Sequence, residues 1–584
     1  MLDLGRETDI SRLYTAIDSS RDAMRPFREK RSRIVREYVG SWYNSEGAPH
    51  EVLVNLLEMA ASAYATGLAY QNPKVRVTTP FLELWPFAFR FQQSLNAYIK
   101  AMRFCDTIQE IVLDAFFTMG IAKVVQAEWE SVQLADDEWA DPGRPQVVRV
   151  SPDDFGMDMG VKEIRRSKFM WDEYRAPWDL VRENPDYDKR VLKKLAPTSK
   201  WDRGEEETHG ITSGTLTDDD EYGPMVDLMD VWLPELKAVG VFSRHVRGRP
   251  LKLVDQGPKG GPYEVLYFSG VPDNAMPLSP AHSLMGLHLL YNGLMRKQSR
   301  QARRQKTNPT YRPSAAADAE RLKRVNDGDW VNVADPSGIN VINQGGVDQA
   351  NVAFSLGVID LFDRQAGNLR AMAGLGPQTS TVGQEQLIHA AASRKEARMQ
   401  QETHKFVVKL LENLAHLMWV DEMLSVPSSV EVSPGSGIRV DTSWTPELRE
   451  GAFWKYNFEI EPYSMTYEPP EVKAQKMERA IGQLVQMYPI LEAAGATIDV
   501  QELVKHYSET LQLPELERVI RFVDLPALER PGPVEQIRPT ETTRNYVRHN
   551  IPTGGTPEAR SSILQQTLLG GGQVTPQQQA QMMR

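Results

Sequence analysis

Apolar residues recur with helical spacing over the first part of the chain, from about residue 10 to residue 120. Within residues 51–70 the apolar positions fall near one face of a helix: Val52, Leu56, Met59, Ala63 and Leu68. A second buried helix is expected over residues 105–129. Between them, residues 72–80 contain prolines and predict a short extended segment.

The pattern changes between residues 146 and 267, where short apolar runs are broken by Pro, Gly and Asp. Runs such as MVDLMDVWL and AVGVFSR predict strands joined by turns. One helix is expected among these strands, at residues 177–195. The first half of the chain therefore predicts a helical part joined to a part of mixed helices and strands.

A long helix is predicted from Pro280, which a first helical turn tolerates, to about Lys306, with Asn308 and Pro309 ending it. Its second half has six basic residues and no acidic one: Arg296, Lys297, Arg300, Arg303, Arg304 and Lys306. At about 100° per residue, all of these except Lys306 lie within an arc of roughly 120°. The pattern thus predicts a basic stripe along one helix face.

A small insert follows, in which a short Ala-rich helix precedes two apolar runs, residues 329–333 and 339–344. A Pro-Ser-Gly turn separates the two runs, so they are predicted to pair as a hairpin. The next amphipathic helix is expected to bury one face: Val352, Leu356, Ile359, Phe362, Ala366 and Leu369. After a Gly- and Thr-rich loop, a capping box at Thr381 and Gln384 opens a helix of about 40 residues.

Strands are expected again near residues 425–469, followed by a second helical block. Beyond residue 524 the chain is rich in Pro, Gly and Gln. Such a composition predicts a tail without regular structure unless a partner orders it.

The chain has 584 residues and a formal net charge of -11, a size that indicates several domains. Its acidity argues against a protein coated with nucleic acid, because phosphate neutralisation needs a clustered excess of Lys and Arg. It permits a local contact through the basic stripe. The single cysteine, Cys105, excludes an intramolecular disulfide framework and is expected to be buried. No membrane span or signal peptide is expected.

The sequence offers no recognisable catalytic constellation: it lacks a P-loop, an HExxH motif and a nucleophile elbow. His389, His404 and His416 lie 15 and 12 residues apart on the predicted long helix, too far to share a metal ion. Asp153 and Asp154 are expected in a turn after a strand. No catalytic residue, metal or cofactor is predicted, and the chain is expected not to be an enzyme.

The succession of these parts resembles the portal proteins of tailed bacteriophages, also called head–tail connectors, particularly those of the short-tailed type. Five stretches carry the resemblance in order and cover most of residues 33–522: LAYQNPKVRV, the strand-rich region that leads into MRKQSRQARRQKTNP, the hairpin insert, AGLGPQTSTVGQEQLIHAAASRKEARMQ, and VQELVKHYSETLQLPELERVI.

The resemblance implies a multidomain α+β portal fold divided as follows: a wing at 1–279, a first stem helix at 280–306, a clip at 307–347, a second stem helix at 348–372, a tunnel loop at 373–383, a long tunnel helix at 384–424, further wing strands at 425–469, a helical crown at 470–524 and a tail at 525–584. Its tunnel-loop candidates are Gln378, Thr379, Ser380 and Thr381, with Arg370 close by. Residues 374–383 have no charge, so we do not expect this loop to hold DNA electrostatically.

In this family, twelve subunits form a ring around a channel for double-stranded DNA at the unique vertex of the capsid. The resemblance therefore implies a virion protein assembled in the host cytoplasm. Its implied partners are copies of itself, DNA bound without sequence specificity, the terminase large subunit, a tail adaptor protein, and the major capsid and scaffolding proteins, with no membrane.

Two other hypotheses are consistent with the sequence. The chain is a DNA-processing enzyme that binds DNA phosphates along the stripe, or an intracellular scaffold without nucleic-acid contact. The stripe itself has three possible roles. It contacts DNA phosphates in a channel, pairs with acidic groups of a neighbouring subunit, or is a solvated helix face.

Overall fold

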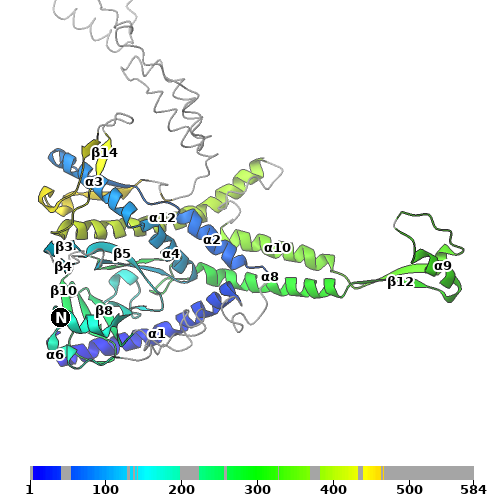
Figure 1. The fold of residues 1–584 in the computed structure, drawn as a ribbon, viewed down its shortest axis with the longest axis horizontal. Coiled ribbons are helices and arrows are strands. Elements are labelled where there is room, and N and C mark those ends of the chain that lie inside the picture. Colours follow the sequence, from blue (N-terminus) through cyan, green and yellow to red (C-terminus); the bar gives the residue numbers. More distant parts are fainter. Residues whose placement is uncertain are drawn as a thin grey trace, which may run out of the picture. The chain divides into compact units, whose positions relative to one another are not determined.

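The computed structural model describes residues 4–40, 54–127, 132–135, 138–140, 143–197, 223–255, 260–326, 328–367, 382–431, 439–461 and 465. The chain divides into two units, Met1–Pro469 and Pro470–Arg584, and every described residue belongs to the first. This part is an α+β structure (Figure 1). The predicted crown and tail lie outside the described residues.

The first part of the chain is helical, as predicted (Figure 1): α1 (Glu7–Val39), α2 (Leu56–Leu68), α3 (Trp85–Ala101) and α4 (Phe104–Phe117). Cys105 is buried in α4, which confirms that expectation. The expected position of Met59 is wrong, because 52% of this residue is exposed. The buried side of α2 instead runs through Leu57 and Tyr64. Val52 lies outside the described residues.

The largest core joins these helices to α12 (Val382–Val420), the long helix predicted from residue 384 to residue 424. Phe91 and Leu95 of α3 are completely buried in it, as are Leu410 and Leu414 of α12. Their spacing of four residues places each pair on one helix face.

The strands predicted between residues 146 and 267 form two antiparallel sheets together with β2, which was not predicted. The helix expected over residues 105–129 is wrong in its extent, because α4 ends at Phe117 and residues 120–127 form β2. Five strands have the order β10-β9-β8-β7-β6: β6 (Phe155–Met157), β7 (Met170–Pro177), β8 (Met225–Leu233), β9 (Ala238–Ser243) and β10 (Lys252–Asp255). Three have the order β11-β2-β5: β2 (Gly120–Ala127), β5 (Arg144–Val150) and β11 (Tyr263–Leu266). A Cβ at Gly120 would lie 2.2 Å from the backbone oxygen of Ile111, so only glycine allows β2 to follow α4 this closely.

The single helix predicted at residues 177–195 is wrong in its extent. Two short helices stand there, α5 (Trp178–Glu183) and α6 (Lys189–Leu192). Asn184 adopts an extended ψ of 116°, since the proline at position 185 disfavours the helical conformation in the residue before it.

The described part also contains short strand pairs and single-turn helices. Three of the pairs are β1 (Val75–Thr78) with β16 (Asn457–Ile460), β3 (Val132–Ala135) with β4 (Glu138–Ala140), and β14 (Ser429–Glu431) with β15 (Arg439–Asp441). The single turns are η1 (Leu82–Leu84), η2 (Ile164–Arg166), η4 (Pro313–Ala315), η5 (Pro336–Gly338), η6 (Pro446–Leu448) and η7 (Phe453–Lys455).

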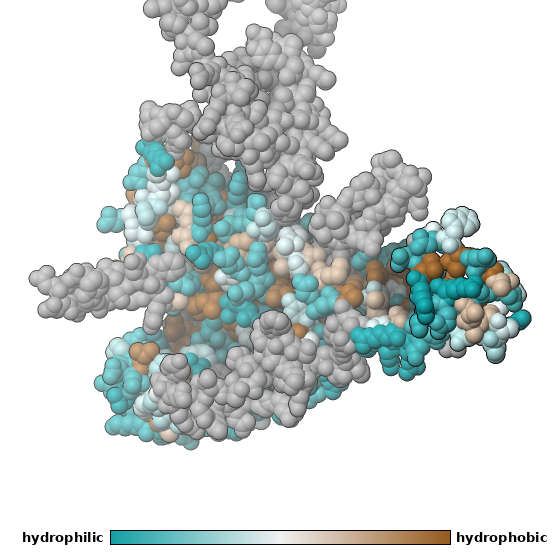
Figure 2. Space-filling model, turned by 45° about the vertical axis from the view of Figure 1, so that its right-hand side comes forward, coloured by the Kyte–Doolittle hydropathy of each residue, from teal (hydrophilic) through white to brown (hydrophobic). Residues whose placement is uncertain are grey.

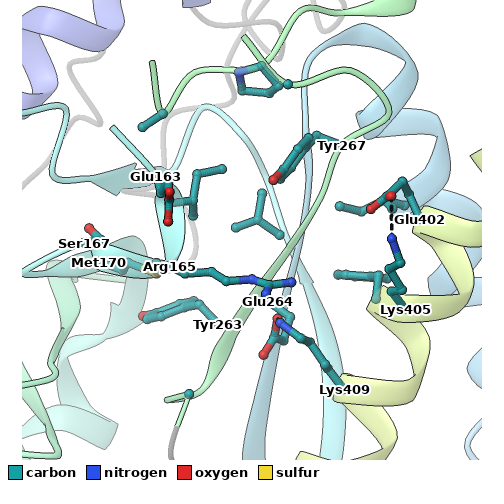
Figure 3. Close-up of a pocket in the computed structure, with 18 of the residues that line it drawn as sticks. Glu163, Arg165, Ser167, Met170, Tyr263, Glu264, Tyr267, Glu402, Lys405 and Lys409 are labelled. Atoms are coloured by element: carbon teal, nitrogen blue, oxygen red, sulfur yellow. Dashed lines mark hydrogen bonds and ion pairs between the residues drawn. The ribbon is translucent and has the colours of Figure 1, made fainter. Parts of the chain in front are cut away.

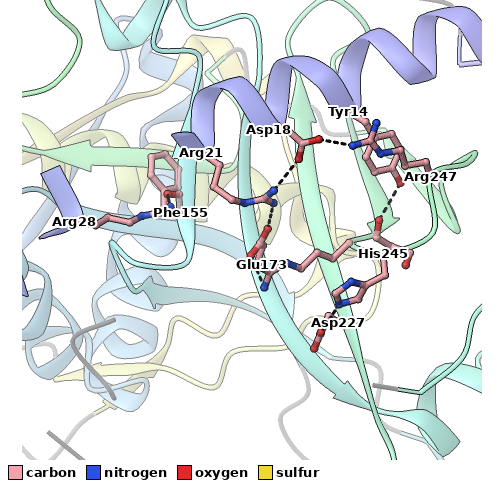
Figure 4. A network of polar contacts seen from close by, with 11 residues as sticks. Tyr14, Asp18, Arg21, Arg28, Phe155, Glu173, Asp227, His245 and Arg247 are labelled. Atoms are coloured by element: carbon pink, nitrogen blue, oxygen red, sulfur yellow. Dashed lines mark hydrogen bonds and ion pairs between the residues drawn. The ribbon is translucent and has the colours of Figure 1, made fainter. Parts of the chain in front are cut away.

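Helix α1 is fastened to the five-stranded sheet by apolar and charged contacts. Ile17 packs in one cluster with Trp171 and Phe242 of the sheet. Figure 4 shows the ionic network between α1 and the sheet, in which Arg21 joins Asp18 of its own helix to Glu173 of β7. Further polar contacts of this network include Arg247 to Asp18 at 2.7 Å, Arg244 to Glu173 at 3.3 Å and His245 to Asp227 at 2.8 Å.

A buried lysine links the two sheets. Lys123 of β2 lies 2.6 Å from a carboxylate oxygen of Asp172 on β7 and 2.6 Å from one of Asp230 on β8. Burial alone lowers the pKa of Lys123, but the two carboxylates outweigh it and raise this pKa, so the amine stays charged. Tyr263 donates a hydrogen bond to Asp172 and completes the cluster.

Candidate subunit and nucleic-acid interface

The helix predicted from Pro280 to Lys306 is α8 (Pro280–Arg303). Its start is capped by Ser279, whose hydroxyl accepts a hydrogen bond from the backbone N–H of His282 at 3.0 Å. Its end comes three residues earlier than predicted, because Lys306 already pairs with Gln344 in a strand.

The second predicted stem helix is α10 (Gln349–Ala366), which begins and ends on standard caps. Asp348 accepts a hydrogen bond from the backbone N–H of Ala350 at 3.1 Å. Gly367 ends the helix with φ of +105°, a conformation that other residues rarely adopt.

Helices α8 and α10 lie side by side and antiparallel (Figure 1). Late in α8, the Gln298 amide donates to the backbone oxygen of Asn351 at 3.0 Å and to Ser355 Oγ at 3.1 Å. At the other end, the Gln365 amide donates to the backbone oxygen of Ser283 at 2.9 Å. These bonds fix which face of each helix meets the other.

The basic stripe of α8 points away from α10. Arg300 stands two residues beyond Gln298, about 200° around the helix, and Gln298 faces α10. Five of the six predicted basic residues are exposed, and the sixth, Arg296, is partly buried: Lys297, Arg300, Arg303, Arg304 and Lys306 are the exposed ones. Within the described ranges, none of these five forms an ion pair.

The buried face of α10 overlaps the predicted one only in part. Four residues make up the buried face: Ser355, Val358, Phe362 and Ala366. Phe362 and Ala366 agree with the prediction and Ile359 is partly buried, but Val352 and Leu356 are 37% and 63% exposed. Leu369 lies outside the described residues. The predicted face is wrong in part because apolar residues occupy more of the circumference of α10 than α8 can cover. Helix α8 covers only the middle of this apolar region.

Apolar side chains of α10 therefore stand in solvent on both sides of its buried face. Val352 and Leu356 occupy one flank. Phe354 and Leu361, which are 54% and 55% exposed, occupy the other. Exposed apolar residues grouped in this way mark interaction surfaces.

Beyond the ends of α8 and α10 lies a small distal unit (Figure 1), which contains α9 (Ala316–Leu322) and the strand pair β12 (Lys306–Tyr311) and β13 (Ile339–Gln344). The predicted pairing of residues 329–333 with 339–344 is wrong. Pro309, expected to end a helix, lies in β12 opposite Val341. The segment before the Pro-Ser-Gly turn is held by Asp318 and not by a strand pair. The Asp318 carboxylate accepts a hydrogen bond from the backbone N–H of Ala334 at 2.9 Å.

The distal unit buries little of its own apolar surface. Tyr311 is 57% exposed, Val341 61% and Trp330 fully exposed, at 103%. Figure 2 shows apolar surface among the hydrophilic atoms of this unit. Two strands alone are marginally stable in water, so this unit too is suited to contact with another molecule.

Some of the other residues singled out from the sequence lie outside the described residues, and the rest have ordinary structural roles. Gln378, Thr379, Ser380, Thr381 and Arg370, the tunnel-loop candidates, lie outside the described residues.

The remaining candidate acids and two of the three histidines have local partners, and the side chain of His389 lies outside the described residues. Asp153 and Asp154 lie in a turn after β5, as predicted, and Asp153 pairs with Arg31 at 2.7 Å. His404 is 3.3 Å from the backbone oxygen of Ile460. His416 packs edge-on against Phe453, and burial lowers its pKa.

Among the described residues, no group of three His, Cys, Asp or Glu side chains is arranged to hold a metal ion. None of the helices in the described ranges combines the length and the apolar character needed to cross a lipid bilayer.

A comparison of the sequence with models of known protein families finds no matching family, and a comparison with curated proteins finds no matching sequence. A function for this chain is therefore inferred from its own residues.

Proposed function

We propose that this chain is the subunit of a phage portal, a ring at the unique capsid vertex through which double-stranded DNA is packaged and later ejected. It forms a channel and has no enzymatic activity of its own. In the virion it docks the terminase large subunit during packaging and a tail adaptor protein afterwards, and it contacts the major capsid and scaffolding proteins.

The observation that carries this proposal is the pair of uncovered apolar flanks on α10. In a head-to-tail ring, each subunit presents two unlike surfaces, one to each neighbour. The flank of Val352 and Leu356 and the flank of Phe354 and Leu361 supply two such surfaces on one helix. Complete burial of a Leu or Phe side chain contributes roughly 1.5–3 kcal/mol, so repeated flank contacts would hold a ring together.

The basic stripe supports a DNA conduit in particular. Five of its six side chains are exposed, and the stripe points away from the partner helix α10. Contacts from Lys and Arg to phosphate are independent of base sequence, and a moving duplex needs this property. A few such contacts in an acidic protein would guide DNA without arresting it.

The test reverses the charge of three exposed stripe residues, Lys297, Arg300 and Arg304, to Glu. The matched control reverses Lys189, Arg190 and Lys193 on and beside α6, which are also exposed. We expect both proteins to form rings, and the stripe variant to package or retain several-fold less DNA than the control.

Each other outcome has a definite meaning. Failure of the stripe variant alone to form rings would assign the stripe to the contact between subunits. Normal rings with normal packaging would reject its contact with DNA and leave it a solvated face.

A further inference from the structure

A cavity of about 510 Å³ lies where the two sheets meet α12 (Figure 3). Its walls come from η2 and the turn after it, from Met170 on β7, from Trp232 on β8, from β11 with the connection toward α8, and from one face of α12. Its volume is within the range of small-molecule sites in proteins.

The inner wall of the cavity is apolar and aromatic. Met170, Trp232 and Tyr263 are each less than a tenth exposed, and Leu266 and Phe406 adjoin them. An apolar ligand group would lose its water against these side chains, which is the principal source of affinity in such sites.

The rim is charged, and nearly all of its charges are neutralised locally. Four ion pairs involve rim residues: Lys162 with Asp273 at 3.0 Å, Glu163 with Arg166 at 3.3 Å, Glu402 with Lys405 at 2.8 Å, and Glu264 with Lys409 at 3.6 Å.

Arg165 is the exception. It forms no ion pair with any residue in the described ranges, and Figure 3 shows its side chain reaching across the cavity toward Glu264. Glu264 is already held by Lys409. Lys409 also acts electrostatically on the Glu412 carboxyl. The cation of this group that has no ion pair among the described residues is therefore Arg165, beside an apolar wall.

Of Arg165, Lys409 and Glu264, the Glu264 side chain is the least exposed. The pKa of the Glu264 carboxyl is raised overall: burial raises it most, Lys409 and then Arg165 lower it, and the nearby Glu412 also raises it. A second anion that met Arg165 would relieve its unbalanced charge without breaking the contact between Glu264 and Lys409.

We propose that this cavity is a binding site for a small hydrophobic carboxylic acid, whose apolar group enters the cavity and whose carboxylate meets the Arg165 guanidinium. A guanidinium is suited to this task because its planar array of donors matches a carboxylate. The proposal is independent of ring formation and concerns a ligand that the portal role does not require.

The test uses two probes with the same apolar group, 3-(2-naphthyl)propanoate and 2-(2-naphthyl)ethylamine, titrated against the full-length protein by ligand-observed NMR. The expected Kd of the carboxylate is about 0.1–1 mM, given its size. The amine should bind at least several-fold more weakly, because its ammonium group would meet the like charge of the Arg165 guanidinium.

Arg165→Gln and Arg165→Glu should weaken carboxylate binding, the second by roughly ten-fold or more, since a hydrogen bond to a charged group is lost. Lys168→Glu is the matched control, because Lys168 is equally exposed but does not line the cavity. Arg165 is exposed and has no ion pair among the described residues, so its variants should fold; circular dichroism would verify this.

A third variant blocks the space itself. Gly270 lines the cavity, is exposed, and would meet only Tyr267, at 3.5 Å, if it carried a Cβ. Gly270→Trp should therefore fold normally and abolish binding of the carboxylate. Equal affinity for the two probes, unchanged affinity in Arg165→Glu, or full binding in Gly270→Trp would each overturn the proposal, as would no binding of either probe.

Discussion

His288 shows how one residue couples the interior of this protein to pH. It is completely buried in α8, and its Nδ1 has no hydrogen-bond partner among the described residues. Its Nε2 lies 3.5 Å from the amide of Asn292, which is engaged with Val54: it donates to the backbone oxygen at 2.9 Å and accepts from the backbone N–H at 3.0 Å. Burial first, and then the charge of Arg296, lower the pKa of His288 to about 4.

This depressed pKa has a defined effect on stability. Below the ordinary value of 6.5, His288 in the unfolded chain takes up a proton, whereas in the folded chain it stays neutral until the pH approaches 4. Acidification from pH 6.5 to pH 4 therefore favours unfolding through this residue, by up to ~3 kcal/mol.

We predict that His288→Leu removes this contribution. As the pH falls from 6.5 to 4, the thermal midpoint of the wild type should fall more than that of the variant, measured at equal protein concentration. The control is His282→Leu, which changes an exposed histidine in the first turn of the same helix. Parallel pH profiles for wild type and His288→Leu would contradict the prediction.

At the scale of the elements, patterns carried by neighbouring residues were predictable and contacts between distant residues were not. The start of α8 at Pro280 follows from local chemistry, because Ser279 and Pro280 provide a cap and a first turn. The pairing of β12 with β13 joins residues 306–311 to 339–344. The apolar run nearest in sequence was therefore a misleading choice of partner.

The face of α10 illustrates the same limit within one helix. Its periodicity predicts an apolar stripe, but the arc of apolar residues is wider than one neighbouring helix covers. The hydrogen bonds of Gln298 with Asn351 and Ser355, and of Gln365 with Ser283, orient α10 so that Val358 is buried and Leu356 is exposed. The stripe of α8 was predictable because it depends on helical geometry alone.

We predict that charges placed on one α10 flank prevent ring assembly without unfolding the subunit. Phe354→Glu and Leu361→Glu each put a carboxylate on a surface that would be buried between subunits, where an unpaired charge is strongly unfavourable. Ala353→Glu is the control, because Ala353 is exposed on the polar side of the same helix. Light scattering should find smaller species for the first two variants and the wild-type mass for the third.

If all three variants kept the wild-type mass, the flank of Phe354 and Leu361 would not be an interface. If all three lost it, the effect would come from negative charge on α10 in general. Circular dichroism at the same concentration separates either outcome from loss of folding.

At the scale of the whole molecule, the described part of the chain combines a well-packed region with a helix pair and a distal unit that leave apolar surface exposed. The buried contact of Lys123 with Asp172 and Asp230 ties the two sheets together, and α12 joins the first helices in the largest core. Tyr311, Trp330 and Leu356, by contrast, all lie in solvent. This contrast within one chain favours a subunit that completes its structure by assembly.

The most direct test of the proposed portal role is electron microscopy of the purified full-length protein, combined with a measurement of its mass in solution. A portal subunit should give ring-shaped particles with a central hole and the mass of about twelve subunits of 66.0 kDa each. A monodisperse monomer or dimer without a channel, at concentrations where the subunit is folded, would contradict it.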